Sequence, residues 1–397
     1  MLKKFRNILA VVVILNLVAC YPITVKEGKR SLKKVRYLWP KFKDDLDTDS
    51  LVASAQRSME YLNRLNDNTL FYFGPDTFSV KHVRQSLSTF LQIIQKKPTI
   101  DLLNRKLRKE FLLYRATGLN WDNQVLFTGY FEPTFEGSAE RNSIYKYPLY
   151  VRPDNLFNVD LGLFRHKLHG QRLMGRIEGK NIVPYYERKD IVEGKALKEK
   201  NLEIAWLKDP LDIAILQIQG SGMVKLTNGE ILKVGYSATN GHPYKSIGKY
   251  MIDKGYIKRE NLSLQTISSY LKNHPDKKTE ILNYNPSYVF FKINDEGPLG
   301  SISVPLTPGR SLAVDSRLFP KGALVYIKCR KPIIGGNGSI TGWVPFSRFL
   351  LNQDTGGAIK GPGRADIFWG NGPYAEMTAG HLKHFGEMYF LVMKPDS

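Results

Sequence analysis

Two aspartates lie close together near the end of the chain, in the segment QDTGGAIKGPGRADIFWG that covers residues 353–370. They are Asp354 and Asp366, and glycines separate and follow them. No metal-binding cluster, nucleophile triad or phosphate loop accompanies them in the sequence. The chemistry open to this segment is therefore proton transfer by one carboxyl group or by two.

Metal and cofactor chemistry has little support. The seven histidines are scattered, and neither an HExxH nor a CxxC motif occurs. Lys245 and Ser246 lie near glycines, but without the G-x-x-x-x-G-K-[ST] order of a phosphate loop. The cysteines are Cys20 and Cys329, and the second lies in VYIKCRKP, which predicts a strand position rather than a nucleophile. We expect no metal and no cofactor.

Three further segments combine residue types that turn a chain or bind a sugar. LQIQGSG contains Gln219 and Ser221 and predicts a strand running into a Gly-Ser-Gly turn, which is either a plain hairpin or a ligand-binding turn. GYSATNGHPYKSIG places Tyr236 and Asn240 before a predicted helix. FTGYFEP, residues 127–133, groups an aromatic ring, a hydroxyl and a carboxylate, as carbohydrate sites and many β-turns do.

The elements that position these residues begin with helices. From residue 49 to about 117, apolar residues recur at three- and four-residue steps in SLVASAQRSMEYLNRL, VRQSLSTFLQIIQ and DLLNRKLRKEFLLYRA. Asp49 or Ser50 is the expected N-cap of the first helix. The apolar stripes are interpreted as core faces.

Short strands follow. Between about residues 121 and 291 the extended pieces include VLFTGYFEP, YPLYVRP, DIAILQIQGSGMVKL and SYVFFKI, with predicted helices in SIGKYMIDKGY and SLQTISSYLKNH. From about residue 297 strands return in SLAVDSRLF, ALVYIKCR, ADIFWG and MYFLVM. The fold class is therefore mainly β, with barrel-like domains and helices at the start.

The chain is large and basic. Its 397 residues predict two or three domains, and its 42% hydrophobic and 24% charged residues are those of a folded protein. With 58 Lys and Arg against 37 Asp and Glu, the formal net charge is +21, which favours acidic partners: nucleic acid, anionic lipid or an acidic polymer. No zinc-knuckle, RNA-recognition or helix-turn-helix pattern occurs, so nucleic acid is not expected.

The N-terminus indicates export. Residues 1–20 combine Lys3, Lys4 and Arg6 with an apolar run too short to span a bilayer, and end in LVAC. This ending resembles the lipobox of bacterial lipoproteins, which implies that Cys20 is lipidated and inserted in the outer membrane, with the protein facing the periplasm. Residues 21–45 are basic and poor in pattern, and are interpreted as a tether.

Taken in order, the segments resemble one family. The resemblance is to the membrane-bound lytic murein transglycosylase A family and covers about residues 121–395. It rests on FTGYFEP, VPYYER, DPLDIAILQIQGSG, GYSATNGHPYKSIGKYMIDKG, NPSYVFFK, GPLGSISVPLTPGRSLAVD and QDTGGAIKGPGRADIFWGNGPYAEMTAGHLKHFGEMYFLV. The last part is similar to the family's C-terminal three-aspartate domain, and the three aspartates here are Asp315, Asp354 and Asp366.

The resemblance implies a fold. A double-psi β-barrel is expected from residues 297–397 together with the N-terminal helical part, residues 46–129. A second β-barrel domain, residues 130–292, is inserted before the C-terminal part. A groove between the two barrels is expected to hold a glycan strand.

The resemblance also implies a reaction, lytic exotransglycosylase cleavage of the MurNAc–GlcNAc β-1,4 bond of peptidoglycan without water. The sugar's own 6-hydroxyl closes a 1,6-anhydro ring, so one carboxyl group can serve first as acid and then as base. That group is Asp366, supported by Asp354 and Asp315, and it needs a raised pKa. The expected groove contacts are Thr128, Tyr130, Gln219, Ser221, Tyr236 and Asn240.

Alternatives remain at this stage. A two-carboxylate peptidoglycan hydrolase would use Glu132 as its second carboxylate. A lipoprotein that only binds peptidoglycan would need no buried acid. In a regular strand Arg364 and Asp366 share a face, where the arginine would lower the pKa of the acid, so a twist or bulge is expected to turn Arg364 away. The point of attack, the need for peptide stems, wall-remodelling partners and oligomeric state stay open.

Overall fold

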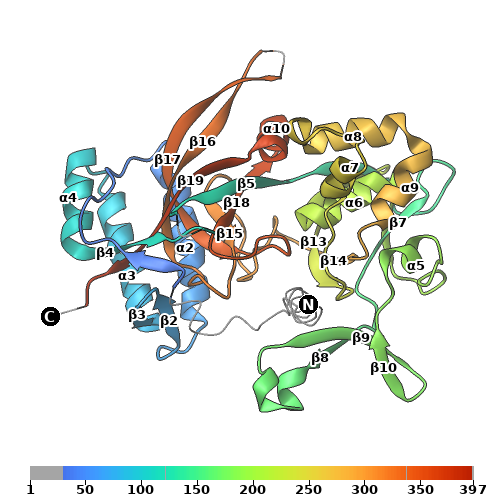
Figure 1. Ribbon diagram of the computed structural model, residues 1–397, viewed down its shortest axis with the longest axis horizontal. Helices are drawn as coiled ribbons and strands as arrows, with labels where there is room; N and C mark the ends of the chain where they lie inside the picture. The colour runs from blue at the N-terminus through green and yellow to red at the C-terminus, as the bar shows by residue number, and fades with distance from the viewer. Residues whose placement is uncertain (1–29, 121, 337, 396–397) are drawn as a thin grey trace, which may run out of the picture.

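The computed structural model describes residues 30–120, 122–336 and 338–395, which form two β-rich units side by side (Figure 1). Within these ranges no helix has the length and apolar character needed to cross a bilayer. The predicted signal peptide, Cys20 and residues 21–29 of the predicted tether lie outside the described residues.

The first unit is a closed six-stranded barrel. Its ring follows the order β19, β16, β17, β15, β18 and β5, and β5 pairs back onto β19. Two pairings are parallel, β15 with β17 and β18 with β5, and the rest are antiparallel. The bounds are β5 (Val125–Glu132), β15 (Ser311–Val314), β16 (Leu324–Ile334), β17 (Ile340–Asp354), β18 (Arg364–Asn371) and β19 (His384–Met393).

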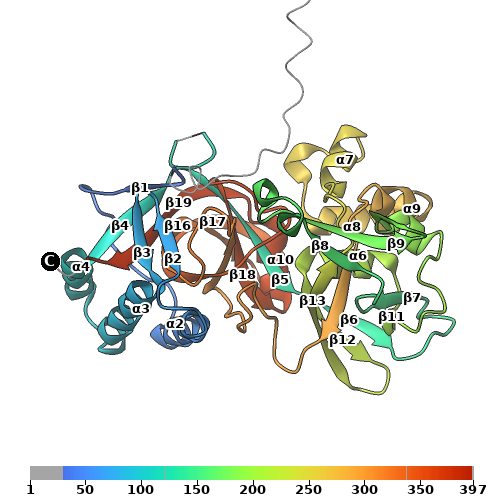
Figure 2. The same ribbon diagram turned by 90° about the horizontal axis from the view of Figure 1, so that it is seen from below.

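Two further strands and a set of helices complete this unit. β4 (Phe111–Ala116) pairs with β19, and β1 (Leu32–Lys34) pairs with β4. The helices are α2 (Thr48–Asn63), α3 (Val80–Gln95), α4 (Ile100–Glu110) and α10 (Pro373–His381), and a hairpin of β2 (Leu70–Phe73) and β3 (Asp76–Ser79) precedes α3. Figures 1 and 2 show α2, α3 and α4 together at the end of this unit remote from the inserted one.

The predicted helices are confirmed with two corrections. The N-cap of α2 is Asp47, whose side chain accepts a hydrogen bond from the Ser50 N–H, so neither Asp49 nor Ser50 is the cap. The third helix ends at Glu110, although its apolar pattern continues to residue 116. The residues after Glu110 form a strand because their backbone groups pair with both β1 and β19.

The predicted tether over residues 21–45 is wrong for its second half. Leu32 is 1% exposed and Phe42 is fully buried. The Phe42 ring contacts Tyr326 edge-on, with centroids 4.7 Å apart, and Asn104 hydrogen-bonds both the N–H and the C=O of Phe42. Buried apolar residues such as Leu32 and Phe42 therefore anchor this otherwise basic and largely exposed stretch to the core.

The inserted unit is a second barrel. Its six strands follow the order β14, β13, β12, β6, β11 and β7, and a bridge between Val151 and Phe291 joins the two ends of the sheet. The bounds are β6 (Thr134–Ser138), β7 (Tyr147–Tyr150), β11 (Glu203–Leu207), β12 (Ser221–Leu226), β13 (Ile231–Thr239) and β14 (Val289–Ile293). The mainly β class with two barrels and N-terminal helices is thus confirmed.

Helices and a small sheet surround this second barrel. The helices are α5 (Arg188–Val192), α6 (Pro210–Gln219), α7 (Ile247–Asp253), α8 (Leu264–Asn273) and α9 (Pro275–Asn283), with single turns at Leu161–Leu163, His166–Leu168 and Arg259–Asn261. The small sheet contains β8 (Phe157–Asp160), β9 (Arg172–Glu178) and β10 (Asn181–Pro184), and projects below the barrel in Figure 1.

The segment DIAILQIQG is a helix, so the prediction of a strand running into a Gly-Ser-Gly turn is wrong. Asp209 caps α6 by accepting from the Leu211 N–H, and Pro210 occupies the first turn. Gly220 ends the helix with φ of 82°, a conformation that favours glycine. An almost wholly apolar helix shows no clear period, and this sequence therefore reads equally well as a buried strand.

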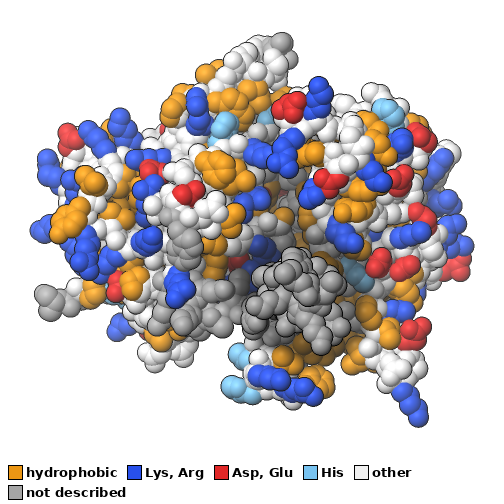
Figure 3. All heavy atoms as spheres, in the orientation of Figure 1, with side chains coloured by type: hydrophobic (Ala, Val, Ile, Leu, Met, Phe, Trp, Pro, Cys, Tyr) orange, Lys and Arg blue, Asp and Glu red, His pale blue; other side chains and the backbone are white. Residues whose placement is uncertain are grey.

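Lys and Arg side chains are distributed over the face of the molecule that Figure 3 shows. Lys and Arg side chains are dense at the end of the molecule formed by α4, and carboxylates are few there. The Cys329 thiol, predicted to lie in a strand, is in β16 and buried.

Candidate active site

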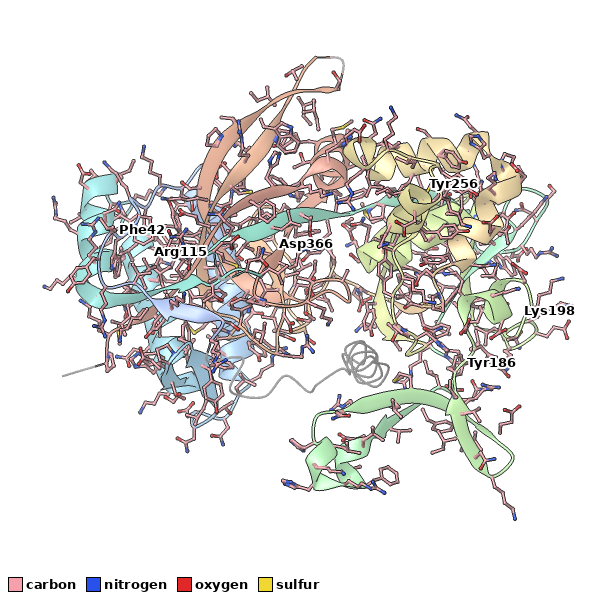
Figure 4. The ribbon with its side chains drawn as sticks, viewed as in Figure 1. Phe42, Arg115, Tyr186, Lys198, Tyr256 and Asp366 are labelled. Atoms are coloured by element: carbon pink, nitrogen blue, oxygen red, sulfur yellow. The ribbon has the colours of Figure 1, made fainter. Side chains whose placement is uncertain are left out.

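A cavity of about 620 Å³ lies between the two barrels and is called the groove below. The first unit contributes residues around Tyr130, Ser301, Asp354 and Asp366, and the inserted unit contributes residues from the end of α6, β13 and the loop before β14. Figure 4 shows Asp366 on the side of the first barrel that faces the inserted unit. Asp354 and Asp366 therefore border one cavity.

Asp366 is fixed by its strand. It lies in the middle of β18, paired with Thr128 of β5 on one side and Ala313 of β15 on the other. The Thr128 hydroxyl donates to Asp366 Oδ1 over 2.7 Å. Burial raises the pKa of Asp366 to about 6, against the lowering effects of Thr128 and Arg364 and with a further raising contribution from Asp354. Near neutral pH this carboxyl group can hold a proton and release it.

Arg364 is not turned away, contrary to the sequence-based expectation. Its guanidinium donates to the Thr128 hydroxyl oxygen over 3.2 Å, so Arg364, Thr128 and Asp366 form one hydrogen-bonded chain. The Arg364 charge lowers the pKa of Asp366, but burial has the larger effect. The arginine thus acts on the acid without forming a direct ion pair with it among the described residues.

Asp354 lies at the end of β17 and accepts three hydrogen bonds. The Tyr130 hydroxyl donates to its Oδ2 over 2.8 Å, and the Ser301 and Thr355 N–H groups donate to its Oδ1 over 2.9 and 2.8 Å. Burial nevertheless raises the pKa of Asp354 to about 6. Burial and the Asp354 charge together raise the pKa of the Tyr130 hydroxyl well above its ordinary value, so Tyr130 remains a donor.

Asp315 is outside the groove. It is 1% exposed and forms a two-point ion pair with Arg317, whose Nε and guanidinium nitrogen lie 2.9 and 2.7 Å from its oxygens. It also accepts from the Gly361 N–H over 2.9 Å. Burial raises its pKa, but the bonds from Arg317 and Gly361 outweigh burial and hold the pKa below its ordinary value. Asp315 therefore anchors the glycine-rich loop between the other two aspartates.

The inserted unit brings three of the expected contact residues to the groove. They are Gln219, Ser221 and Tyr236. Gln219 Oε1 accepts from the Phe131 N–H over 3.0 Å and so links the two units beside Tyr130. Tyr236 is 52% exposed, which leaves its ring free to contact a ligand.

Asn240 does not border the groove, contrary to expectation. It is 1% exposed, and its amide donates to the C=O groups of Tyr186 and Pro286 while its oxygen accepts from the Tyr288 N–H. These bonds hold the loop after β13 in place. A small polar residue in a glycine-containing loop is as well suited to that task as to ligand binding.

Glu132 is also outside the groove. It is 6% exposed and is paired in register with Asn371. Burial raises its pKa, while a hydrogen bond with Asn371 and the Lys233 charge lower it. The second carboxyl group that borders the groove with Asp366 is Asp354.

Three further side chains that no motif in the sequence predicted also border the groove: Arg188, Gln217 and Tyr244. Arg188 is 5% exposed and donates to Gln217 Oε1 and to the C=O groups of Asn285 and Ser287. The segment VPYYER carried the only signal, an arginine beside two tyrosines. Among the described residues, no group of three or more His, Cys, Asp or Glu could hold a metal ion.

The fold and the groove define a class: a barrel with an inserted second barrel, and two half-buried carboxyl groups that border the groove where the barrels meet. Two family sequence models match within the chain. The MltA specific insert domain matches residues 126–292, and the 3D domain matches residues 310–392.

Two curated relatives are named membrane-bound lytic murein transglycosylase A. The Vibrio cholerae protein is 34% identical over 67% of this chain and 65% of its own length, and the Escherichia coli K12 protein is 33% identical over 70% and 67%. The aligned part thus spans about two thirds of these relatives. The chain belongs to the membrane-bound lytic murein transglycosylase A family, a family of enzymes that act on murein.

Solved structures of lytic murein transglycosylases are similar to this chain in fold. A membrane-bound lytic murein transglycosylase from Agrobacterium tumefaciens has a TM-score of 0.73 at 27% identity, covering 91% of this chain and 98% of that one. E. coli MltA with bound chitohexaose has a TM-score of 0.69 at 26% identity, covering 94% and 98%.

Proposed function

We propose that this protein cleaves the MurNAc–GlcNAc β-1,4 bond of peptidoglycan without water and leaves a 1,6-anhydro-MurNAc end, with Asp366 as acid and base. The observation that carries the proposal is the position of Asp366. It borders the groove, is hydrogen-bonded by Thr128 and has a pKa raised to about 6. An acid with such a pKa is matched to proton transfer near neutral pH.

In the first step, neutral Asp366 gives its proton to the glycosidic oxygen as the bond from that oxygen to the anomeric carbon breaks. The leaving sugar keeps the proton as its 4-hydroxyl. Positive charge develops at the anomeric carbon, next to an Asp366 that is now negative. The Thr128 hydroxyl, which donates to Oδ1, stabilises the carboxylate at that moment.

In the second step, the 6-hydroxyl oxygen of the same MurNAc bonds to the anomeric carbon, and its proton passes to Asp366. The acid is restored and no water is consumed. A two-carboxylate hydrolase would need a separate base to activate water. Glu132 does not border the groove, and Asp354 is occupied by Tyr130, Ser301 and Thr355 as donors.

We assign Asp354 a supporting role, because its charge raises the pKa of Asp366. Tyr130 is assigned to position Asp354, while Gln219, Ser221 and Tyr236 contact the glycan from the inserted unit. The chitohexaose complex of the E. coli relative supports a sugar chain as the occupant of the groove. Asp315 is assigned to the loop that presents Asp354 and Asp366.

We retain from the sequence the division into a C-terminal three-aspartate part, residues 297–397, and an inserted domain, residues 130–292. We also retain an outer-membrane lipoprotein facing the periplasm, anchored through acylated Cys20. The curated relatives are called membrane-bound, which supports a membrane location. Acylation is tested by labelling cells with a radioactive fatty acid: the protein takes up label, and a Cys20→Ala variant does not.

The reaction is tested by mass spectrometry of purified peptidoglycan after incubation with the chain that begins at Tyr21. The expected products end in anhydro-MurNAc and are lighter by one water than hydrolysed ends. An Asp366→Asn variant should give none. Reducing MurNAc ends would make the protein a hydrolase and Asp354 its second carboxylate. Sacculus binding without cleavage would make it a binding lipoprotein.

A further inference from the structure

A second cavity, of about 550 Å³, lies far from the groove. It is formed where the chain leaves β1 and passes the C-terminal end of α4, and we call it the basic cavity. Its lining comprises Lys34, Val35, Arg36, Tyr37, Leu38, Trp39, Arg108, Phe111, Leu112 and Lys394. Four of these ten side chains are cationic and none is acidic, so the cavity suits an anion.

The cations differ in how far they are already engaged. Lys34 pairs with Asp76 over 2.9 Å, and Lys394 Nζ donates to the C=O groups at the end of α4. Arg36 and Arg108 are exposed, and in the part of the chain that the structure describes neither has a carboxylate within ion-pair distance. Two guanidinium groups at one cavity are a phosphate-binding combination, because each can bind two oxygens at once.

The rim of the basic cavity is apolar. Leu38 is 98% exposed at the tip of a turn, with φ of 56°, and Tyr37 beside it is 82% exposed. The turn is held from within, because Trp39 Nε1 donates to the Val35 C=O over 3.2 Å and its ring packs edge-on to Phe42. A leucine and a tyrosine presented to solvent next to arginines form the pattern that binds a lipid interface.

The basic cavity is also close in the sequence to the predicted lipid anchor at Cys20. Ten residues lead from Cys20 to Arg30, the first described residue, and an extended chain of that length reaches roughly 35 Å. The rim residues follow within nine positions of Arg30. An acyl group on Cys20 would therefore keep this end of the molecule near the bilayer, and Figure 3 shows the same end to be rich in Lys and Arg.

We propose that the basic cavity binds the phosphate headgroup of an anionic phospholipid while Leu38 and Tyr37 enter the interface. The protein would then rest on its membrane at the α4 end, with the inserted unit pointing away into the wall. Murein also carries negative charge, but it offers no hydrocarbon for an exposed leucine. The proposal needs neither the acyl anchor nor the murein-cleaving reaction to be correct.

The test is vesicle flotation of the chain that begins at Tyr21, which carries no acyl group and keeps every described contact of the basic cavity. Vesicles of phosphatidylcholine are compared with vesicles that also contain phosphatidylglycerol. Binding is expected only to the second kind, and to weaken with added salt. Reversing both arginines, Arg36→Glu with Arg108→Glu, should weaken binding by about tenfold or more, since each basic residue at an anionic surface contributes separately.

Two further variants separate binding at the basic cavity from a general effect of net charge and test the contribution of the apolar rim. Lys189→Glu with Lys200→Glu makes the same charge change at exposed positions of the inserted unit and should leave binding unchanged. Leu38→Asn removes the apolar tip but suits a positive φ, so it should weaken binding severalfold without lowering the melting temperature. Murein cleavage should be unaffected in all of these variants.

Three outcomes would overturn the proposal. They are equal binding to both kinds of vesicle, an equal loss in the Lys189 and Lys200 control, and full binding by the Leu38→Asn chain. Loss of sacculus binding by the arginine variant with vesicle binding intact would assign the basic cavity to murein instead. A chain that cleaves no murein but floats with anionic vesicles would refute the proposed reaction and leave this inference standing.

Discussion

Two sides of the first barrel place carboxyl groups in opposite environments, one with a cation partner and one without. On the side covered by the N-terminal segment, Arg310 and Arg348 are 0% and 1% exposed, and each is met by a carboxylate. Arg310 lies 2.7 Å from Asp44, and Arg348 makes two bonds of 2.8 Å to Asp45. On the groove side Asp366 and Asp354 are half-buried, and neither has a direct cation partner among the described residues.

The difference separates a structural use of charge from a chemical one. The paired charges hydrogen-bond to one another, and they fix residues 44–47 against the barrel. Unpaired and partly desolvated carboxyl groups hold their protons to higher pH, which costs stability when they ionise and makes proton transfer possible. The same kind of side chain thus stabilises one side of the barrel, and on the other side it has a pKa that allows it to exchange a proton near neutral pH.

The pH dependence of stability should differ in sign between the two sides. The pKa of Asp45 is lowered: burial raises it, but Arg348 and Lys331 outweigh burial. Asp45 therefore contributes stability above about pH 4 that is lost as the pH falls. The pKa of Asp366 is raised to about 6, so its ionisation removes stability as the pH rises from about 4 through 6.

The largest expected effect is that of Asp366→Asn. Murein cleavage should fall by about 10³-fold or more, because the amide cannot exchange a proton. Asn can still accept the hydrogen bond from Thr128, so at pH 7 the variant should be more stable by roughly 1–2 kcal/mol, a value reduced for the partial exposure of the site. Anhydro-product yield and urea unfolding measure the two effects.

The control for this substitution is Asp295→Asn at an exposed position, which should change neither quantity. If the Asp366→Asn variant kept more than a tenth of the normal activity, Asp366 would not be the acid and base. A loss of stability at pH 7 would show that the carboxylate is compensated in the groove and would abolish the contrast with Asp45.

The same chemical change on the other side should act in the opposite direction. Asp45→Asn leaves the buried Arg348 without its carboxylate, and the free energy of unfolding should fall by about 3 kcal/mol at pH 7. The deficit should shrink as the pH falls through the lowered pKa of Asp45, because the normal residue then becomes neutral too. Urea unfolding at several pH values measures it. A deficit independent of pH would mean that the loss of stability comes from packing and not from charge.

The fold could be predicted from sequence where local pattern and tertiary pairing agree. The strand ADIFWG and the helix VRQSLSTFLQIIQ are where the pattern places them, in β18 and α3. The pattern fails at Phe111–Ala116, where pairing on both edges overrides a helical period, and at Pro210–Gln219, where a buried helix has no polar face to mark its period.

Some residues of the candidate site could likewise be predicted from the sequence, and others could not. Asp366, Asp354 and Gln219 could be chosen because glycine-rich motifs carry them, and all three border the groove. Asn240 came from the same type of motif and is a buried loop support instead. Arg188 could not be found locally, because its position depends on three oxygen acceptors that include residues almost a hundred positions away.

A smaller effect should follow from Thr128→Val, which keeps the shape of the side chain. The substitution removes the donor that lowers the pKa of Asp366 and frees Arg364 from its acceptor. Activity should fall about tenfold, the scale of one hydrogen bond to a charged group. The alkaline limb of the pH–rate profile should move to higher pH, and a Thr128→Ser control should restore the normal profile. If the alkaline limb did not move, Thr128 would have no effect on the pKa of Asp366.

The smallest expected effect is that of Tyr130→Phe, and its direction is the sharpest test of the coupled pair. The substitution removes the Tyr130 donor to Asp354, so the pKa of Asp354 should rise. Asp354 then stays neutral to higher pH, and less negative charge acts on Asp366. The alkaline limb should therefore move to lower pH, opposite to Thr128→Val, with a loss of activity of about threefold. An alkaline limb that does not move in Tyr130→Phe would mean that the two carboxyl groups titrate independently, and the raised pKa of Asp366 would then rest on burial alone.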